Sequence, residues 1–570
     1  MNATKENAMC RMKLVMAAAI AAVAVQLLCV HSANAATNAA VNATADDTTP
    51  KPPIKRVGPD DAAPRTALVV QDNVAMRAAA KDSSPAQAQL WRGEALEIRG
   101  ERPDHFQVYD YRRERGGFVR KAALLPLNGP AAQPDALLAV LRVVRQQPGS
   151  ESLGLGLAAA YVQSTTAAQM NGIDGAEALD AMGTLAERLA DRASRTQSRS
   201  DGVATVAPSA AETQVAAQLD VAARYGLRFR TLEREAGAMQ LCYDGEAFRR
   251  VLAMPASTPE QKARAALALT RVDCLDPVAT PPQREQMDQW RADVLDKVDL
   301  RDPALATHWR NRVLMRQSGV WSSLAFIRAR RASAASAAGA AGATGAAAVP
   351  VALQVDASSA ASRRSLEAFA RVVPAELSDD DQPTYNDAAM RGNAMRWAAL
   401  PMGAPEQALG PVKLNVAAGQ PGETCLTLTM NGAKEGSAPL LRHCAWGLVM
   451  TASARINREG TAISIASVPA DGWRELWLLR RTAQGWKVSV LPPVAAQPGL
   501  GYAEFAGWVP GGKELLVARE SRAEGRYKRS YELVDLDTLE TKRQAGDVTM
   551  LGAFQRWQAA DWKGTSLSAR

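Results

Sequence analysis

"QLWRGEALEIRGERPDHFQVY" (Gln89–Tyr109) is the stretch that decides how the first folded part of the chain is built. Apolar and polar residues alternate along it, and Leu96, Ile98, Phe106 and Val108 fall at strand spacing. Its Arg-Gly and Arg-Pro-Asp steps are turn signals. The stretch therefore predicts short β-strands joined by tight turns.

The same pattern extends from Arg65 to about Leu127, and three of its segments resemble a known family. Asn73–Arg77, Leu90–Gly93 and Gly117–Val119 are similar to the "LNVRS", "L-x-x-G" and "G-[W/Y]-V" segments of bacterial Src-homology-3-like domains. The resemblance implies a small N-terminal β-barrel over 65–127. In that family the barrel binds cell-wall peptide or another protein, or it braces its neighbour.

The first 35 residues have the pattern of a secretory signal. Lys5, Arg11 and Lys13 form a basic segment, an apolar run extends from Leu14 to Val30, and small residues precede a cleavage site after Ala35. The run is also long enough for a retained membrane anchor, but the small residues at its end favour cleavage. We therefore expect export, with the periplasm as the destination, and a chain that does not span a membrane once the signal is removed.

Amino-acid composition predicts a spacer after the signal and gives no indication of nucleic-acid binding. Residues 36–64 are rich in Thr, Pro, Asp and Ala without periodicity, which predicts a flexible spacer. Cleavage after residue 35 leaves 64 Lys and Arg against 58 Asp and Glu, a formal charge of +6. This mild excess is compatible with an anionic envelope surface or polymer and does not indicate nucleic-acid binding.

The mature chain keeps four cysteines, Cys242, Cys274, Cys425 and Cys444. An even number in an oxidising compartment indicates disulfides. Three connectivities are open, and pairing 242 with 274 and 425 with 444 is favoured because each pair falls inside one expected domain. The rival use is a zinc site, which the absence of Cys-x-x-Cys spacing disfavours.

Residues 134–331 predict a central all-α domain. "PDALLAVLRVVRQ" places Leu137, Leu138, Leu141 and Val144 on one helical face. "EAFRRVLAMPASTPEQKARAALAL" resembles the junction between hairpins of tetratricopeptide-like arrays; the alternative is an irregular helical domain, because no repeat of about 34 residues is present.

A low-complexity segment separates the helical domain from the rest of the chain. Residues 332–353 are rich in Ala and Gly and predict a linker, with three glycines, Gly339, Gly342 and Gly345, weakening any helix. Residues 354–400 then predict a helical connector that contains one short helix.

Residues 401–570 predict an all-β domain with a diffuse internal repeat. Residues 452–466 match 504–518, and residues 554–568 begin a third copy. The "W-x-P-x-G-K-x-L" core at Trp508–Leu515 resembles blades of Tol-associated β-propellers. We therefore expect a propeller-like domain, with a β-sandwich as the alternative, and the fold class is multidomain α+β.

The C-terminal domain also carries the candidate binding surface. Trp473 and Trp477 flank charged residues at strand spacing, which predicts exposure, whereas the repeat positions of Trp508 and Trp557 predict core residues. A basic hairpin follows, and its candidate residues for an anionic partner are Arg526, Tyr527, Lys528 and Arg529.

No motif for a catalytic nucleophile, a phosphate loop or a His-rich metal cluster occurs in the sequence. We therefore expect a non-enzymatic periplasmic or cell-envelope binding or scaffold protein without cofactor or metal. An envelope protein or peptidoglycan is the expected partner, and the sequence does not fix the oligomeric state. The alternative is an envelope hydrolase that uses carboxylates of the C-terminal domain, because such pairs leave no spacing signature.

Overall fold

Part of the chain is described by the structure, a computed structural model. The predicted signal and spacer lie outside the described residues, which all belong to one compact unit within Lys55–Arg570. The described ranges are 65–197, 208–234, 237–340, 351–400, 406–420, 422–434, 436–495 and 499–565.

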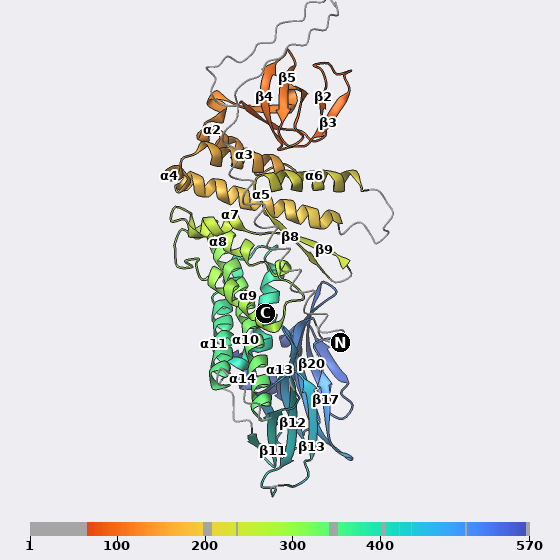
Figure 1. Ribbon diagram of the computed structural model, residues 1–570. Helices are drawn as coiled ribbons and strands as arrows, with labels where there is room; N and C mark the ends of the chain where they lie inside the picture. The colour runs from red at the N-terminus through yellow and green to blue at the C-terminus, as the bar shows by residue number, and fades with distance from the viewer. Residues whose placement is uncertain are drawn as a thin grey trace, which may run out of the picture. The chain divides into compact units, whose positions relative to one another are not determined.

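The N-terminal domain is one seven-stranded sheet in the order β3-β2-β6-β5-β4-β1-β7 (Figure 1). The alternating apolar residues that predicted the strands, Leu96, Ile98, Phe106 and Val108, all lie in its core. The sheet does not close, because β3 and β7 at its two ends do not pair, so the expected barrel is an open curved sheet. Its strands are β1 (Thr66–Val69), β2 (Val74–Arg77), β3 (Ala86–Leu90), β4 (Ala95–Glu101), β5 (His105–Asp110), β6 (Arg115–Arg120) and β7 (Leu124–Leu127).

The central region is mainly helical, and the predicted face of its first helix is buried. It is not all-α, however, because β8 (Phe229–Glu233) and β9 (Met239–Tyr243) form a two-stranded hairpin within it. The helices are α2 (Pro134–Val144), α3 (Glu151–Ser164), α4 (Ala167–Met170), α5 (Ile173–Gln197), α6 (Ala210–Arg224), α7 (Glu246–Ala253), α8 (Pro259–Leu269), α9 (Pro281–Leu295), α10 (Thr307–Ala340), α11 (Val351–Ala370) and α12 (Gln382–Met395).

Helix α10 continues through Ala340, so the first nine residues of the predicted linker are helical. Alanine, the strongest helix former, dominates this segment, and Ala332 is buried, which together outweigh the glycine at 339. Residues 341–350 of the predicted linker lie outside the described part of the chain. The predicted connector is part of the helical domain, because Ala361 of α11 and Met395 of α12 share one core with α8, α9 and α10.

The C-terminal region is all-β apart from two short terminal helices, and it consists of two sheets that share one core. Leu414 and Leu426 of the first sheet pack with Ile463 and Leu479 of the second, as in a sandwich. The first sheet holds β10 (Glu406–Leu409), β11 (Val412–Ala418), β12 (Glu423–Met430) and β13 (Leu441–Trp446). The second holds β14 (Leu448–Ile456), β15 (Ala462–Ala470), β16 (Trp473–Thr482), β17 (Gly485–Leu491), β18 (Leu500–Trp508), β19 (Glu514–Ala523), β20 (Arg526–Asp535) and β21 (Thr541–Ala545).

The expected propeller is wrong, although the first two repeat units do adopt the same strands. β14 and β15 correspond to β18 and β19, with the tight turn of each repeat between them. Instead of forming separate blades, the two units merge, because β16 pairs in parallel with β18 through Trp473 opposite Gly501. The expected third copy is helical, with α13 (Gly552–Trp557) and α14 (Ala560–Thr565) in place of strands.

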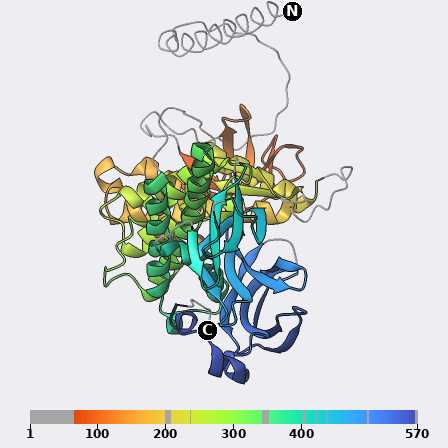
Figure 2. The ribbon, with the colours of Figure 1, turned by 90° about the horizontal axis from the view of Figure 1, so that it is seen from below.

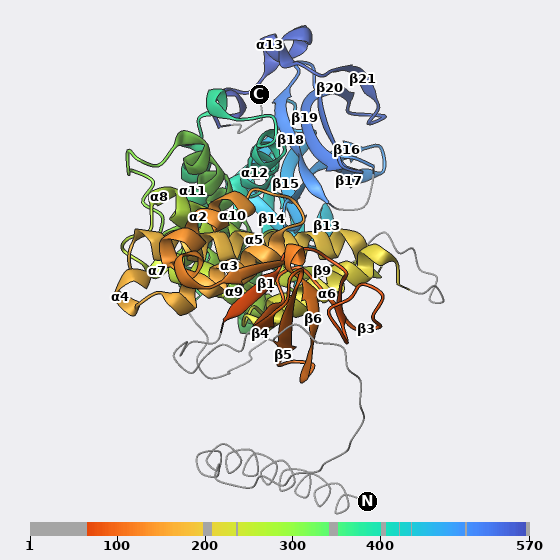
Figure 3. The same cartoon turned by 90° about the horizontal axis from the view of Figure 1, so that it is seen from above.

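Helices cover one face of the large sheet. Figure 2 shows α10 and its neighbours, in green, on one side of the cyan and blue strands, and Figure 3 shows α12 beside β18. Leu448 and Val468 of the sheet lie in the same core as Val320 and Leu324 of α10. In the described residues no helix combines the length and the apolar character that a membrane span requires.

Candidate functional site

The predicted exposed tryptophans are buried, which corrects the expectation for this surface. Trp473 is 1% exposed and Trp477 is 3% exposed. Both lie on β16, which has strands on either side and is covered on both faces, so strand alternation does not place either ring in solvent. His443 of the first sheet packs edge-on against Trp477, with ring centroids 4.9 Å apart.

The two tryptophans predicted as core residues differ from each other. Trp508 is half-buried and packs against a core cluster, whereas Trp557 is 42% exposed. Trp557 ends α13 rather than standing in a third sheet repeat, so the equivalence that predicted its burial does not hold.

The basic hairpin lies at the β19–β20 turn, and Arg526, Tyr527 and Lys528 are exposed as expected. The Tyr527 hydroxyl donates to the carbonyl oxygen of Pro383 at 2.9 Å and lies 2.9 Å from Asp387 Oδ1 of α12. Arg529 Nε lies 2.8 Å from Glu520 Oε1. Of the three cationic candidates, Arg529 is therefore paired with a carboxylate of the protein, and binding of an anionic partner here stays a prediction.

The turn at Gly93 joins the N-terminal sheet to the helices. Gly93 has φ of +86°, and a Cβ atom built there would lie 2.3 Å from the carbonyl oxygen of Ser152 in α3. Both the conformation and the close approach require glycine. The hydroxyl of Tyr225, which follows α6, donates to the Gly93 carbonyl at 2.6 Å. The glycine of the "L-x-x-G" segment thus has a structural role at a domain junction.

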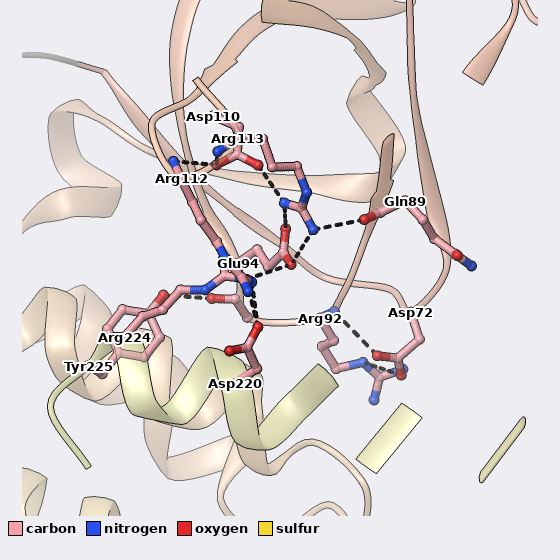
Figure 4. A network of polar contacts seen from close by, with 11 residues as sticks. Asp72, Gln89, Arg92, Glu94, Asp110, Arg112, Arg113, Asp220, Arg224 and Tyr225 are labelled. Carbon is pink, nitrogen blue, oxygen red and sulfur yellow. Dashed lines mark hydrogen bonds and ion pairs between the residues drawn. The ribbon is translucent and has the colours of Figure 1, made fainter. Parts of the chain in front are cut away.

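Glu94, the next residue, is the centre of a buried polar network (Figure 4). Its carboxylate is 1% exposed and accepts hydrogen bonds from Arg113 Nη1 at 2.9 Å and Nη2 at 3.2 Å. Arg224 Nη2 of α6 donates to the same carboxylate at 3.2 Å. Arg113 also pairs with Asp110. One carboxylate therefore connects the β3–β4 turn and the β5–β6 turn of the sheet to a helix 130 residues further along the chain.

Asp72 forms a second attachment on the same side of the sheet. Its carboxylate accepts from Gln214 Nε2 at 2.8 Å and Gln218 Nε2 at 3.2 Å, both on α6, and from the backbone amide of Arg92 at 3.2 Å. Arg92 Nη1 donates to the Gly149 carbonyl at 3.1 Å. The contacts at Asp72, Gly93 and Glu94 together, named here the junction, brace the N-terminal sheet against α3 and α6.

Titration of Glu94 gives a test of the junction. Burial raises the pKa of Glu94, and hydrogen bonding to Arg113 opposes that rise. A carboxyl whose folded pKa exceeds its unfolded value of about 4.3 stabilises the fold most below that pH and less as the pH rises through the folded pKa. The Glu94→Gln variant lacks this titration.

We therefore expect the melting temperature of the parent minus that of Glu94→Gln to be largest near about pH 4 and to shrink towards about pH 7. Thermal unfolding followed by circular dichroism at several pH values measures the difference. A difference that grows with pH would contradict the prediction. It would mean that the guanidiniums of Arg113 and Arg224 lower the pKa of Glu94 by more than burial raises it.

Two tyrosines lie at the end of β5. Alternation places Tyr109 on the other side of the strand from Asp110, where it is half-buried, and Tyr111, the first residue of the following turn, is 67% exposed. The Arg99 guanidinium lies 3.7 Å from the centroid of the Tyr109 ring. Glu97 Oε2 accepts from Arg99 Nε at 2.8 Å and from the Tyr111 hydroxyl at 2.9 Å. We name Glu97, Arg99, Tyr109 and Tyr111 the aromatic face. The alternation in "FQVYDY" was the available signal for it.

Both predicted disulfides are present, Cys242–Cys274 and Cys425–Cys444. Within the described residues, one group of potential metal ligands lies close together, formed by Glu423, Cys425 and Cys444. Its two sulfur atoms are bonded to each other, so they do not offer thiolate ligands in this form.

Three buried carboxylates of the large sheet bear on the hydrolase alternative. Glu504 contacts Arg396 and lies 3.5 Å from Arg474 Nη2. Glu520 and Glu532 likewise pair with arginines, Arg529 and Arg519. Each of the three carboxylates therefore contacts a guanidinium, as in structural ion pairs, and the hydrolase alternative stays a prediction.

No family model, no curated protein sequence and no solved structure matches the chain, so comparison with known proteins assigns it to no family. The aromatic face and the junction are consequently interpreted from their own chemistry.

Proposed function

We propose that the chain is a non-enzymatic cell-envelope binding or scaffold protein whose aromatic face holds peptidoglycan. The observation that carries the proposal is Tyr111, which is 67% exposed on a domain braced from its other side at Glu94. Large aromatic side chains are costly to leave in water and dominate binding hot spots where they are exposed. A braced domain also loses less conformational entropy on binding than a tethered one.

The residues of the aromatic face suit a polymer of sugars and short acidic peptides. The exposed ring of Tyr111 offers a flat surface for stacking on a sugar ring, beside the Tyr109 ring that Arg99 already covers on one face. Arg99, whose side chain is 44% exposed, offers a cation for peptide carboxylates. The excess of basic residues in the mature chain adds a weak attraction to an anionic polymer. An envelope protein that presents an acidic, aromatic surface is the alternative partner.

Co-sedimentation of the mature protein with purified peptidoglycan sacculi tests the proposal. The intact protein is expected to pellet with the sacculi. The Arg99→Ala/Tyr111→Ala variant is expected to bind at least about 30-fold more weakly, because losing two hot-spot residues at about 1 kcal/mol or more each costs at least about 2 kcal/mol. Trp557→Ala, which removes another exposed aromatic ring far along the chain (42% exposed), is the control and is expected to bind like the parent.

Two results would contradict the proposal. One is failure of the intact protein to sediment, and the other is a double variant that binds as tightly as the parent. Release of soluble fragments from the sacculi during the incubation would favour the hydrolase instead.

A further inference from the structure

A cavity of about 580 Å³ lies where the helices meet the two C-terminal sheets. Its walls come from α10 and α11, the turn after α12, and strands β11, β12 and β14. The volume falls within the usual range for ligand sites, about 300–1,000 Å³. The aromatic face and the junction contribute no residue to it.

The chemistry of the walls is apolar. Of the eighteen described residues that line the cavity, twelve are apolar and none carries a charge. Three hydroxyls of the walls donate hydrogen bonds to backbone carbonyls of the protein. Ser358 donates to Ala325 at 2.9 Å, Ser359 to Ala398 at 2.8 Å and Thr424 to Gly447 at 2.7 Å. A ligand therefore meets mainly apolar groups, and the other polar residues of the walls are Ser333, Asn415 and Thr451.

Strand β14 is irregular where it forms the wall. Its ladder with β15 is interrupted between Met450 and Arg455, and Thr451 and Ala452, inside the interruption, line the cavity. The Ser453 hydroxyl accepts from the Ala466 amide at 2.7 Å in place of a backbone partner. Such irregularities re-aim a strand and are enriched beside binding sites.

Trp397 marks the limit of the apolar wall. It lines the 580 Å³ cavity and also a separate polar cavity of about 20 Å³. The guanidiniums of Arg396 and Arg455 lie 4.6 and 5.5 Å from its ring centroid. The apolar region thus ends at an aromatic ring with cations over it, a boundary suited to the polar end of an otherwise apolar ligand.

We propose that this cavity binds one long acyl chain. A methylene group is about as large as a water molecule, whose share of liquid volume is about 30 Å³, so the space suits a chain of roughly 16–18 carbons. Each buried methylene contributes about 0.8 kcal/mol, which makes affinity depend steeply on chain length. The small side chains of the walls, with alanine at 329, 332, 398, 417, 418 and 452, leave the space that the chain fills.

The proposal is tested with the full mature chain after removal of bound lipid. A fluorescent dansyl-undecanoic acid probe is titrated and then displaced by palmitate or by octanoate. Palmitate is expected to displace the probe at least 100-fold more effectively than octanoate, because it has eight more methylenes. Ala452→Phe and Ala417→Phe fill the cavity and are expected to bind palmitate at least 10-fold more weakly. Ala433→Phe, at an exposed turn, is the matched control.

Absence of probe and palmitate binding by the parent would overturn the proposal, and so would equal displacement by the two acids or unchanged binding in both filled variants. If a filled variant fails to fold, the chain-length dependence of the parent still decides. Transfer of the acyl chain from phosphatidylglycerol vesicles, compared with free palmitate, distinguishes a lipid-borne chain from a free acid. The result is independent of sacculus binding, since no wall residue belongs to the aromatic face.

Discussion

Replacing Glu504 with alanine is expected to lower the free energy of unfolding by about 3–5 kcal/mol, because it removes one partner of a buried charge cluster. Arg474 and Arg396 contact this carboxylate, and the three side chains are between 0% and 5% exposed. Burial lowers the pKa of Arg474 to about 10, a sign of how costly its charge is in this environment. Without Glu504 the two guanidiniums face each other with no carboxylate between them.

Urea unfolding of the parent and of Glu504→Ala measures the loss. Glu540→Ala is the matched control, because Glu540 is exposed, and its substitution is expected to change stability by less than about 0.5 kcal/mol. A loss below about 1 kcal/mol for Glu504→Ala would contradict the expected role of the carboxylate. It would mean that the surrounding groups, such as the Asn393 carbonyl 2.5 Å from Arg474 Nη1, already satisfy the arginines.

Removing either disulfide is expected to have a similar effect. The Cys242–Cys274 bond closes 32 residues and the Cys425–Cys444 bond closes 19. Chain entropy then gives losses of about 3.7 and about 3.2 kcal/mol for the paired serine variants. Urea unfolding under non-reducing conditions measures both. Thiol titration of the folded chain that begins after residue 35 is expected to find no reactive sulfhydryl, and detection of free thiols would contradict the pairing.

Local patterns predicted much of the fold. Period-two alternation identified β4 and β5, and a helical stripe identified the buried face of α2. Both disulfides followed from the position of each pair within one expected domain. The strands and the helix follow from residues close together in the sequence, and each disulfide joins cysteines that lie within one domain.

Features that depend on distant partners were not predictable in this way. Nothing near Glu94 indicates that Arg224, 130 residues later, donates to it. Trp473 and Trp477 have the spacing of a strand with one exposed face, but both faces of β16 are buried, with Trp477 in one core cluster and Leu476 in another. The acyl-chain cavity combines side chains from six elements, and its alanines look ordinary in each of them.

The parallel pairing of β16 with β18 has a consequence for self-association. A closed ring of blades leaves few unpaired backbone groups, whereas the merged sheet ends at a free edge, β21. That strand is exposed and carries Lys542 and Arg543, and Lys542 Nζ is held 2.6 Å from Asp535 Oδ2. A second molecule that paired a strand with β21 would place its backbone next to these basic side chains. We therefore expect the charges to disfavour edge-to-edge association.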